Sequence, residues 1–208
     1  FSLQYGAGDL SALRRSIYVS FLLIGTVTIL LNVAVFLWLD PILRWLQVPY
    51  DIYSLMRNYL WIIFWGIVFT FLYNFYAALL RAVGDSVTPL WFLAVSVVLN
   101  IGLDLFLILV LDQGIEGAAV ATVIAQGTAA SGILLYTYKI RPELRLHRED
   151  MRFDRSSLRE ITSFSTLTCV QQSVMNFGIL MVQGLVNSFG TVVMPAFAAG
   201  LKIDSFAY

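Results

Sequence analysis

The sequence predicts an all-α protein, a polytopic bundle of transmembrane helices. Hydrophobic residues make up 59% of the 208 residues and charged residues only 12%, and the mean hydropathy is +0.81, which is more apolar than soluble domains of this length. Several runs also reach the roughly 20 apolar residues that a helix needs to cross a bilayer. These runs lack the ten-residue alternation of membrane β-barrels, and lipid offers no partner for an open sheet edge.

The apolar runs predict five spans and the start of a sixth. They cover residues 16–39, 53–80, 90–111, 114–138 and 158–189, and another run begins near 191. Asp40-Pro41 predicts the end of the first span, and Gln113-Gly114 predicts a tight turn between the third and fourth. Such a short turn predicts that the third and fourth spans are antiparallel neighbours.

The positions of the basic residues predict which loops face the cytoplasm. Of the 13 lysine and arginine residues, 10 lie before the first span, between the second and third, or after the fourth; they are Arg14, Arg15, Arg81, Lys139, Arg141, Arg145, Arg148, Arg152, Arg155 and Arg159. The positive-inside rule therefore predicts that the cytoplasmic segments are 1–15, 81–89 and 139–157, and that 40–52 and 112–114 lie outside.

One long polar stretch, residues 139–157, divides the chain. Its mixed charges are typical of a solvated segment that joins two helix bundles. The sequence therefore predicts a bundle over 1–138, a cytoplasmic linker over 139–157 and the start of a second bundle over 158–208. Because the chain starts at Phe1 without a signal-peptide pattern and stops at Tyr208 inside an apolar run, we expect it to be a piece of a longer protein.

The composition argues against several classes of function. The formal net charge is +0, which predicts no nucleic-acid partner. The lone cysteine, Cys169, cannot form an internal disulfide, and a single histidine, His147, leaves no histidine pair for a metal. No phosphate-binding loop or other catalytic motif is found in the sequence. We therefore predict no enzyme activity, no catalytic residue and no cofactor.

An acidic residue inside the third span requires an explanation. Asp104 lies about four residues from the middle of its run, where a carboxylate costs about 2.5–3.5 kcal/mol unless it faces a partner or a polar cavity. Asn100 lies one helical turn before Asp104, and Ser96 lies one turn before Asn100, so the three share a helix face. This polar stripe indicates a functional site on the span.

The fourth span carries a similar stripe. Thr122 and Gln126 are four residues apart, and the short turn returns this span beside the third. Carboxylate, amide and hydroxyl oxygens can then converge on a proton or on a hard cation such as Na⁺. The alternative is that Asn100, Thr122 and Gln126 only join helix to helix, at about 0.6 kcal/mol each.

The last part of the chain offers neutral polar groups and one cation. Gln172 and Asn176 lie near one face of the run 158–189, which favours a cavity wall able to hydrogen-bond a substrate. Lys202 follows in the truncated last run, where it can balance a carboxylate elsewhere or extend to the interface. We interpret Gln126, Gln172, Asn176 and Lys202 as possible cavity-lining residues.

A succession of motifs resembles the multidrug and toxin extrusion (MATE) family in order and spacing. The motifs are Tyr5-Gly6-Ala7-Gly8-Asp9, Leu80-Arg81-Ala82-Val83-Gly84-Asp85 with Pro89, Asn100 with Asp104, and Gly117-Ala118-Ala119-Val120-Ala121-Thr122. The resemblance covers essentially the whole chain and implies a twelve-helix fold of two lobes. It implies that 1–138 runs from the end of helix 2 through helix 6 of the N-terminal lobe. Segment 139–157 is then the interlobe loop, and 158–208 begins the C-terminal lobe with helix 7 and part of helix 8.

The resemblance also implies a function. MATE proteins are secondary active antiporters that export drugs or other amphiphilic organic compounds in exchange for H⁺ or Na⁺. We accordingly expect a multi-pass, prokaryotic inner or plasma membrane protein, monomeric at full length, whose partners are the lipid bilayer and a small organic substrate.

The resemblance further implies a coupling site. Some members bind a proton or cation with an Asn, an Asp and a Thr of the N-terminal lobe, together with an acid on the first helix. Asn100, Asp104 and Thr122 look like the matching positions, and the first helix is not part of this chain. Gln171 and Gln172 stand where other branches carry a functional glutamate, so the chain is more similar to the DNA-damage-inducible, DinF-like branch.

Two other functions compete with drug export. A lipid-linked precursor flippase of the same superfamily should carry arginines inside its cavity to bind pyrophosphate, and no arginine lies in the interior of a predicted span, since Arg57 and Arg159 stand at span ends. A non-transporting membrane scaffold or embedded enzyme would use its buried polar groups for packing or chemistry alone. Transport that is insensitive to a change at Asp104 would argue against the coupling hypothesis.

Overall fold

The computed structural model describes residues 1–45, 50–146, 150 and 155–188. These residues form eight helical elements and no strand, which confirms the all-α prediction. In chain order the elements are α1 (Ser2–Gly6), α2 (Leu10–Trp45), α3 (Tyr50–Ala82), α4 (Val87–Leu105), the π-helical η1 (Phe106–Val110), α5 (Gly114–Ile140), the 3₁₀ turn η2 (Pro142–Leu144) and α6 (Arg155–Ser188).

Four of the helices are long and apolar enough to cross a membrane. Among the described residues these are Leu10–Trp45, Tyr50–Ala82, Val87–Val110 and Gly114–Ile140, which matches the first four predicted spans. The fifth predicted span, 158–189, forms the 34-residue helix α6. Its serine, threonine, glutamine and asparagine side chains lower its hydropathy, so its membrane passage stays a prediction. The run that begins near 191 lies outside the described residues.

The predicted end of the first span was wrong. Asp40-Pro41 does not stop the helix, because α2 continues through Pro41 to Trp45. A proline inside a helix has no N–H to donate and its ring crowds the carbonyl four residues earlier, so continuing past Pro41 costs about 3 kcal/mol. The Asp40 carboxylate also ties this end of α2 to the start of α3, since it accepts hydrogen bonds from Tyr53 Oη at 3.0 Å and from Arg57 Nε at 2.8 Å.

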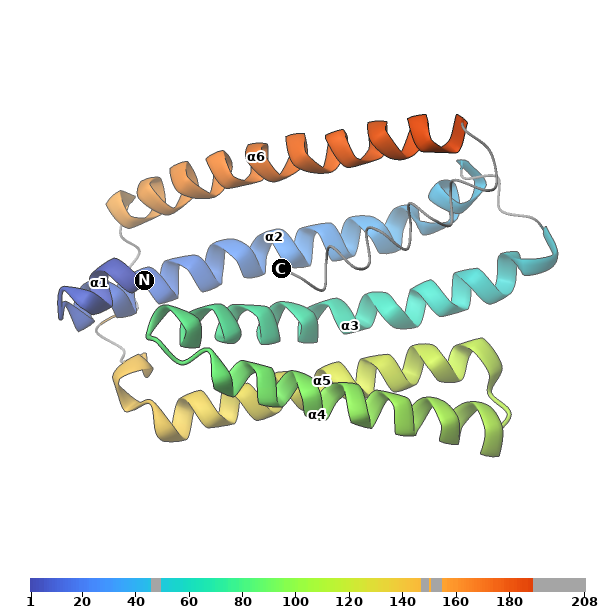
Figure 1. Cartoon of the computed structure of the whole chain (residues 1–208), viewed down its shortest axis with the longest axis horizontal. Coiled ribbons are helices and arrows are strands. Elements are labelled where there is room, and N and C mark those ends of the chain that lie inside the picture. The colour runs from blue at the N-terminus through green and yellow to red at the C-terminus, as the bar shows by residue number, and fades with distance from the viewer. Residues whose placement is uncertain (46–49, 147–149, 151–154, 189–208) are drawn as a thin grey trace. The chain divides into compact units, whose positions relative to one another are not determined.

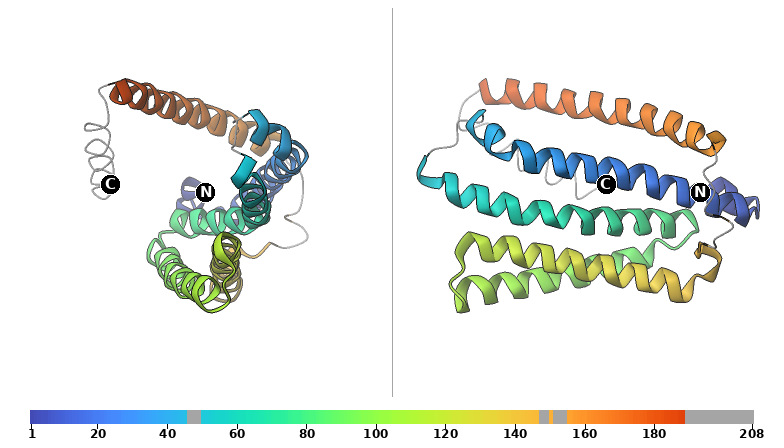
Figure 2. Two further views of the ribbon diagram at one scale, coloured as in Figure 1. Left: turned by 90° about the vertical axis from the view of Figure 1, so that its right-hand side faces the viewer. Right: turned by 180° about the vertical axis from the view of Figure 1, so that it is seen from behind.

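The first compact unit, residues 1–158, is a bundle built around α3. Helix α3 makes its most extensive contact with α5 and also packs against α2, while α4 packs against α5. Figure 1 shows α2, α3 and the α4–α5 pair as neighbouring layers, and the reverse view in Figure 2 agrees. The predicted antiparallel pairing of the third and fourth spans is confirmed.

Small residues let α5 approach its neighbours. Its buried positions include Gly117, Ala119, Ala121, Ala125, Ala129 and Ala130. At Gly132 a Cβ atom would lie 2.6 Å from the ring of Phe92 on α4, so only glycine permits that contact. Close backbone approach of this kind is how helices associate in lipid, where the hydrophobic effect gives no attraction between them.

The apolar core lies at the predicted cytoplasmic end of this unit. Leu13 and Ile17 of α2, Leu79 and Leu80 of α3, and Ile133 of α5 are nearly inaccessible to solvent and contact one another there. Farther along the spans, large apolar side chains are more than half exposed, such as Leu30, Leu31, Val98 and Leu109. A contiguous exposed apolar surface of this extent fits a bilayer and not water.

The second compact unit covers Arg159–Tyr208, and its described residues belong to α6. The division falls at the end of the predicted linker 139–157. The assignment of 1–138 and 158–208 to two lobes stays a prediction.

Candidate functional site

The polar stripe of α4 faces α5 along part of its length. Ser96 is buried, and its Oγ donates a hydrogen bond to the backbone carbonyl of Ala125 at 2.9 Å. Asn100 is partly buried, and its Nδ2 lies 3.4 Å from Oγ1 of Thr122. The structure therefore brings Asn100 and Thr122 together, as the spacing of the two stripes predicts.

The contacts of Thr122 define its role in this pair. Its hydroxyl donates to the carbonyl of Ala118, one turn earlier on α5, at 2.9 Å, and accepts the amide nitrogen of Asn100. With its proton engaged, the hydroxyl holds the amide nitrogen on the α5 side. The amide oxygen of Asn100 then accepts no hydrogen bond from any described residue.

Asp104 is the one carboxylate of this stripe. Its Oδ1 is buried and has no hydrogen-bond partner among the described residues. A buried polar atom without a partner costs about 1–3 kcal/mol, so its presence in a folded protein requires a reason. The unused oxygens of Asp104 and Asn100 are separated by one helical turn on the same face of α4.

A change of helix type begins two residues after Asp104. Residues Phe106–Val110 form a π-helix, in which Leu111 N–H donates to the carbonyl of Phe106 at 3.2 Å. Single π-turns inside α-helices are rare and often lie at functional sites. No pattern in the sequence indicates this turn.

Gln126 is directed toward α3 and away from the Asn100 pair. Its Oε1 accepts a hydrogen bond from Thr70 Oγ1 at 2.8 Å, and Thr70 also bonds the carbonyl of Gly66 at 3.1 Å. Sequence reasoning missed Thr70. The signal was present, because Gly66, Thr70 and Asn74 follow one another at intervals of four on the second span.

The remaining predicted cavity residues belong to the second unit. Gln172 and Asn176 are exposed on α6, and Lys202 lies outside the described residues. Their role as cavity wall stays a prediction.

A second polar cluster lies at the predicted cytoplasmic end, around Asp85. Gly84, at φ +90°, closes α3 in a conformation that suits glycine. Asp85 then accepts hydrogen bonds from Thr88 N–H at 3.1 Å and Thr88 Oγ1 at 2.8 Å, and from Arg141 Nη2 at 3.4 Å. Tyr136 Oη lies 3.5 Å from the same carboxylate.

These contacts determine the charge state of Asp85. Burial opposes ionisation and is the largest single influence, but the hydrogen bonds from Thr88 and Arg141 together outweigh it. The pKa of Asp85 is therefore lower than that of an ordinary aspartate. The carboxylate caps α4 and ties it to the end of α5.

The described residues contain no group of three His, Cys, Asp or Glu side chains placed to hold a metal ion. The Asn100, Asp104 and Thr122 group has a different composition, one carboxylate with neutral oxygens. Such a set suits a proton at Asp104 or a weakly bound monovalent cation, and it is not the carboxylate-rich cage of a resident divalent metal.

Comparisons with known proteins give one consistent picture. The family model MatE matches residues 1–106. A Bacillus subtilis protein described as "Probable multidrug resistance protein YpnP" is 34% identical over 204 residues, covering 98% of this chain and 45% of its own length. A second from the same organism, YoeA, described in the same words, is 29% identical over 80% of this chain and 41% of its own length.

A solved structure agrees with these relatives. The Vibrio cholerae MATE transporter VcmN in its bent form has 25% sequence identity and a TM-score of 0.86, over 99% of this chain and 47% of that one. The chain spans less than half the length of the proteins it matches.

Proposed function

Because this chain belongs to the MatE, or multidrug and toxin extrusion, family of multi-pass membrane transporters, we propose that the protein is a secondary active antiporter that exports drugs or other amphiphilic organic compounds in exchange for H⁺ or Na⁺. The described span of α4 supplies the coupling site. The observation that carries the proposal is the buried Oδ1 of Asp104, which has no partner among the described residues. The relatives are named as transport or resistance proteins and not as enzymes.

The coupling ion would bind Asp104 directly. A proton neutralises the carboxylate, and Na⁺ would bind its oxygens together with the free amide oxygen of Asn100. Thr122 acts as a positioning residue, because its hydroxyl holds the Asn100 amide nitrogen and leaves the amide oxygen available. Ion binding thereby removes the cost of an unpaired charge in the membrane.

Transport follows if the two lobes of the family fold alternate between outward-open and inward-open states. An ion shifts this balance only by its difference in affinity for the two states. A charged, unpaired Asp104 disfavours the state in which its surroundings are driest, and ion binding relieves that cost. The organic substrate then leaves by the other state, as in alternating access.

The test is efflux of a fluorescent cationic dye from membrane vesicles that hold the protein at its full native length. We expect Asp104→Asn to reduce gradient-driven efflux at least about tenfold, because the amide cannot carry the charge that couples the ion (about 1.4 kcal/mol per factor of ten). Separate H⁺ and Na⁺ gradients identify the ion.

The matched control is Asp51→Asn. Asp51 is exposed at the start of α3, so its substitution removes one carboxylate without touching the stripe, and efflux should stay normal. Unchanged efflux in a folded Asp104→Asn protein would reduce Asp104 to a structural residue. Loss of efflux in both variants would point to a general effect of charge.

A further inference from the structure

A pocket of about 200 Å³ opens at the predicted cytoplasmic end of the first unit, away from the α4 stripe. Three membrane helices and the segment after α5 contribute to its walls. Aliphatic side chains come from each: Ile17 of α2, Leu79 of α3, Leu134 of α5 and Leu146. The pocket adjoins the apolar core, and these side chains give it a hydrocarbon wall.

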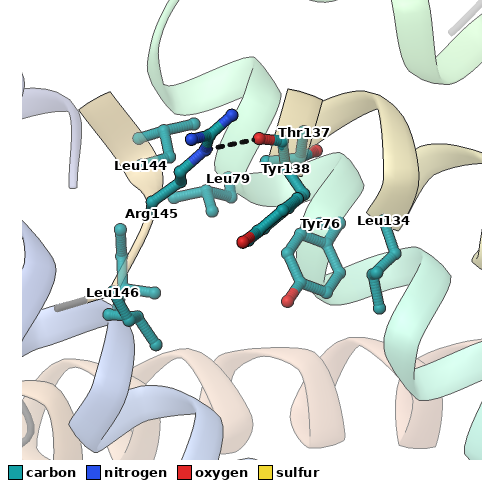
Figure 3. A pocket seen from close by; sticks show the side chains of 9 residues that line it. Tyr76, Leu79, Leu134, Thr137, Tyr138, Leu144, Arg145 and Leu146 are labelled. Carbon is teal, nitrogen blue, oxygen red and sulfur yellow. Dashed lines mark hydrogen bonds between the residues drawn. The ribbon is translucent and has the colours of Figure 1, made fainter. Parts of the chain in front are cut away.

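Polar groups with unused hydrogen-bonding capacity line the same pocket. Arg145 donates Nε to the backbone carbonyl of Tyr138 at 2.6 Å, and its guanidinium carbon lies 4.7 Å from the centre of the Tyr138 ring. These contacts fix the side chain and leave the terminal guanidinium nitrogens, with four of its five N–H groups, without a partner among the described residues. Figure 3 shows the phenol oxygens of Tyr76 and Tyr138 on one side of the pocket, and neither accepts nor donates a hydrogen bond within the described chain.

The charge of Arg145 is not balanced by the described part of the protein. Arg14, Arg57 and Arg141 each approach a carboxylate within 4 Å. Arg145 forms no such pair with a described residue, although it lies partly buried. A fixed guanidinium with free N–H groups is complementary to a phosphate.

The place of the pocket in the membrane specifies the ligand further. It lies where α5 ends at Ile140 and where the basic segment 139–157 is predicted to enter the cytoplasm. At this level phosphate headgroups meet acyl chains, and basic pockets between helices on the cytoplasmic side bind anionic headgroups. A soluble anion would gain nothing from the aliphatic walls.

We propose that this pocket binds one anionic phospholipid of the cytoplasmic leaflet. The phosphate contacts the free N–H groups of Arg145, and a length of one acyl chain lies against Leu79, Leu134 and Leu146. The proposal rests on the predicted orientation in the membrane and not on drug export, so each can fail without the other.

The test is native mass spectrometry of the protein at its full native length, released from nanodiscs that contain equal amounts of phosphatidylglycerol and phosphatidylcholine. We expect phosphatidylglycerol to be retained about fivefold in preference, the ratio that one basic residue supplies near an anionic surface. Arg145→Gln should bring this ratio close to one.

The control is Arg15→Gln. Arg15 is at the same predicted membrane face and likewise donates Nε to a backbone carbonyl, that of Ser11 at 3.3 Å, but it does not line the pocket. The Arg15→Gln protein should keep the full preference for phosphatidylglycerol. An equal loss in both variants would overturn the proposal in favour of general surface charge.

A second variant tests whether the aliphatic wall of the pocket holds an acyl chain. Leu134→Trp should fill the pocket and reduce retained phosphatidylglycerol while leaving Arg145 in place, so it keeps the test decisive if Arg145→Gln does not fold. Equal retention of both lipids by the unmodified protein would overturn the proposal. So would displacement of the lipid by millimolar inorganic phosphate, which would indicate a site for a soluble anion.

Discussion

Two aspartates of the first unit have opposite surroundings. Asp85, at the predicted cytoplasmic end, accepts hydrogen bonds from Thr88 and Arg141. Asp104, inside α4, has a buried oxygen with no partner among the described residues. A carboxylate whose partners are all supplied by the protein stabilises the fold, whereas one that lacks them is available to a ligand. The contrast separates structural from functional acids better than burial does.

The largest expected effect on stability is at Asp85. We expect Asp85→Ala to lower the free energy of unfolding by about 2 kcal/mol, because α4 loses its cap and Arg141 loses its carboxylate. Thermal unfolding of the detergent-solubilised protein measures this loss. Asp9→Ala is the comparison, since Asp9 caps α2 through Ala12 N–H at 2.9 Å without an ion pair. An equal loss of stability in both variants would show that the ion pair of Asp85 with Arg141 adds nothing to the stability.

The opposite result is expected at Asp104. Asp104→Asn should leave stability unchanged or raise it by about 1 kcal/mol, because an amide in a dry site costs less than an unpaired carboxylate. The same unfolding measurement, carried out beside the efflux assay, checks this. A loss as large as that of Asp85→Ala would show that Asp104 has a structural partner and would remove the contrast between the two acids.

Ser96 should have a smaller, purely structural effect. Ser96→Ala removes the hydrogen bond to the carbonyl of Ala125, and such bonds between membrane helices contribute about 0.6 kcal/mol. We expect a small drop in the unfolding temperature and normal dye efflux. Impaired efflux at unchanged stability would instead extend the functional stripe by one turn beyond Asn100.

The smallest expected effect concerns pH. The pKa of Asp85 is lowered in the folded protein, so the unfolded chain takes up this proton first as the pH falls. The stabilisation is fully present above the ordinary aspartate pKa of about 3.9 and is lost as the pH falls through the lower folded value. Unfolding curves at pH 6 and pH 3 should therefore differ less for Asp85→Asn than for the unmodified protein. If the stability changes between pH 6 and pH 3 by the same amount in both proteins, Asp85 does not contribute to the pH dependence of stability.

The fold was predictable where the signal is a sum over many residues. Twenty apolar positions outweigh any local exception, so three of the four spans were placed to within a few residues, and the first runs six residues longer at each end. Pro41 shows the limit of the method. The rule that proline ends a helix depends on a local cost, one lost hydrogen bond and a clash with the preceding turn. The contacts of Asp40 with Tyr53 and Arg57, which the sequence does not reveal, tie this part of α2 to α3.

The site was predictable only in part, for a geometric reason. Spacing by four shows which residues share a helix face, and the short turn before Gly114 shows that α4 and α5 are neighbours, so the approach of Asn100 to Thr122 could be foreseen. Spacing does not show which neighbour a face meets. Gln126 shares its stripe with Thr122 and yet bonds Thr70 of α3, because α5 lies between two helices.

The π-helical turn after Asp104 also sets an angle. Each residue of an α-helix advances the chain by about 100° around the axis. A π-turn contains one residue more than an α-helical turn, because its hydrogen bonds join residues five apart and not four. The turn at 111–113 therefore leaves α4 rotated from where an unbroken α-helix would place it. Deleting one residue from Phe106–Val110 would restore the α repeat and swing the start of α5 around the axis relative to Asp104. The number of residues in this turn therefore helps to set the direction in which the chain enters α5 relative to the polar stripe.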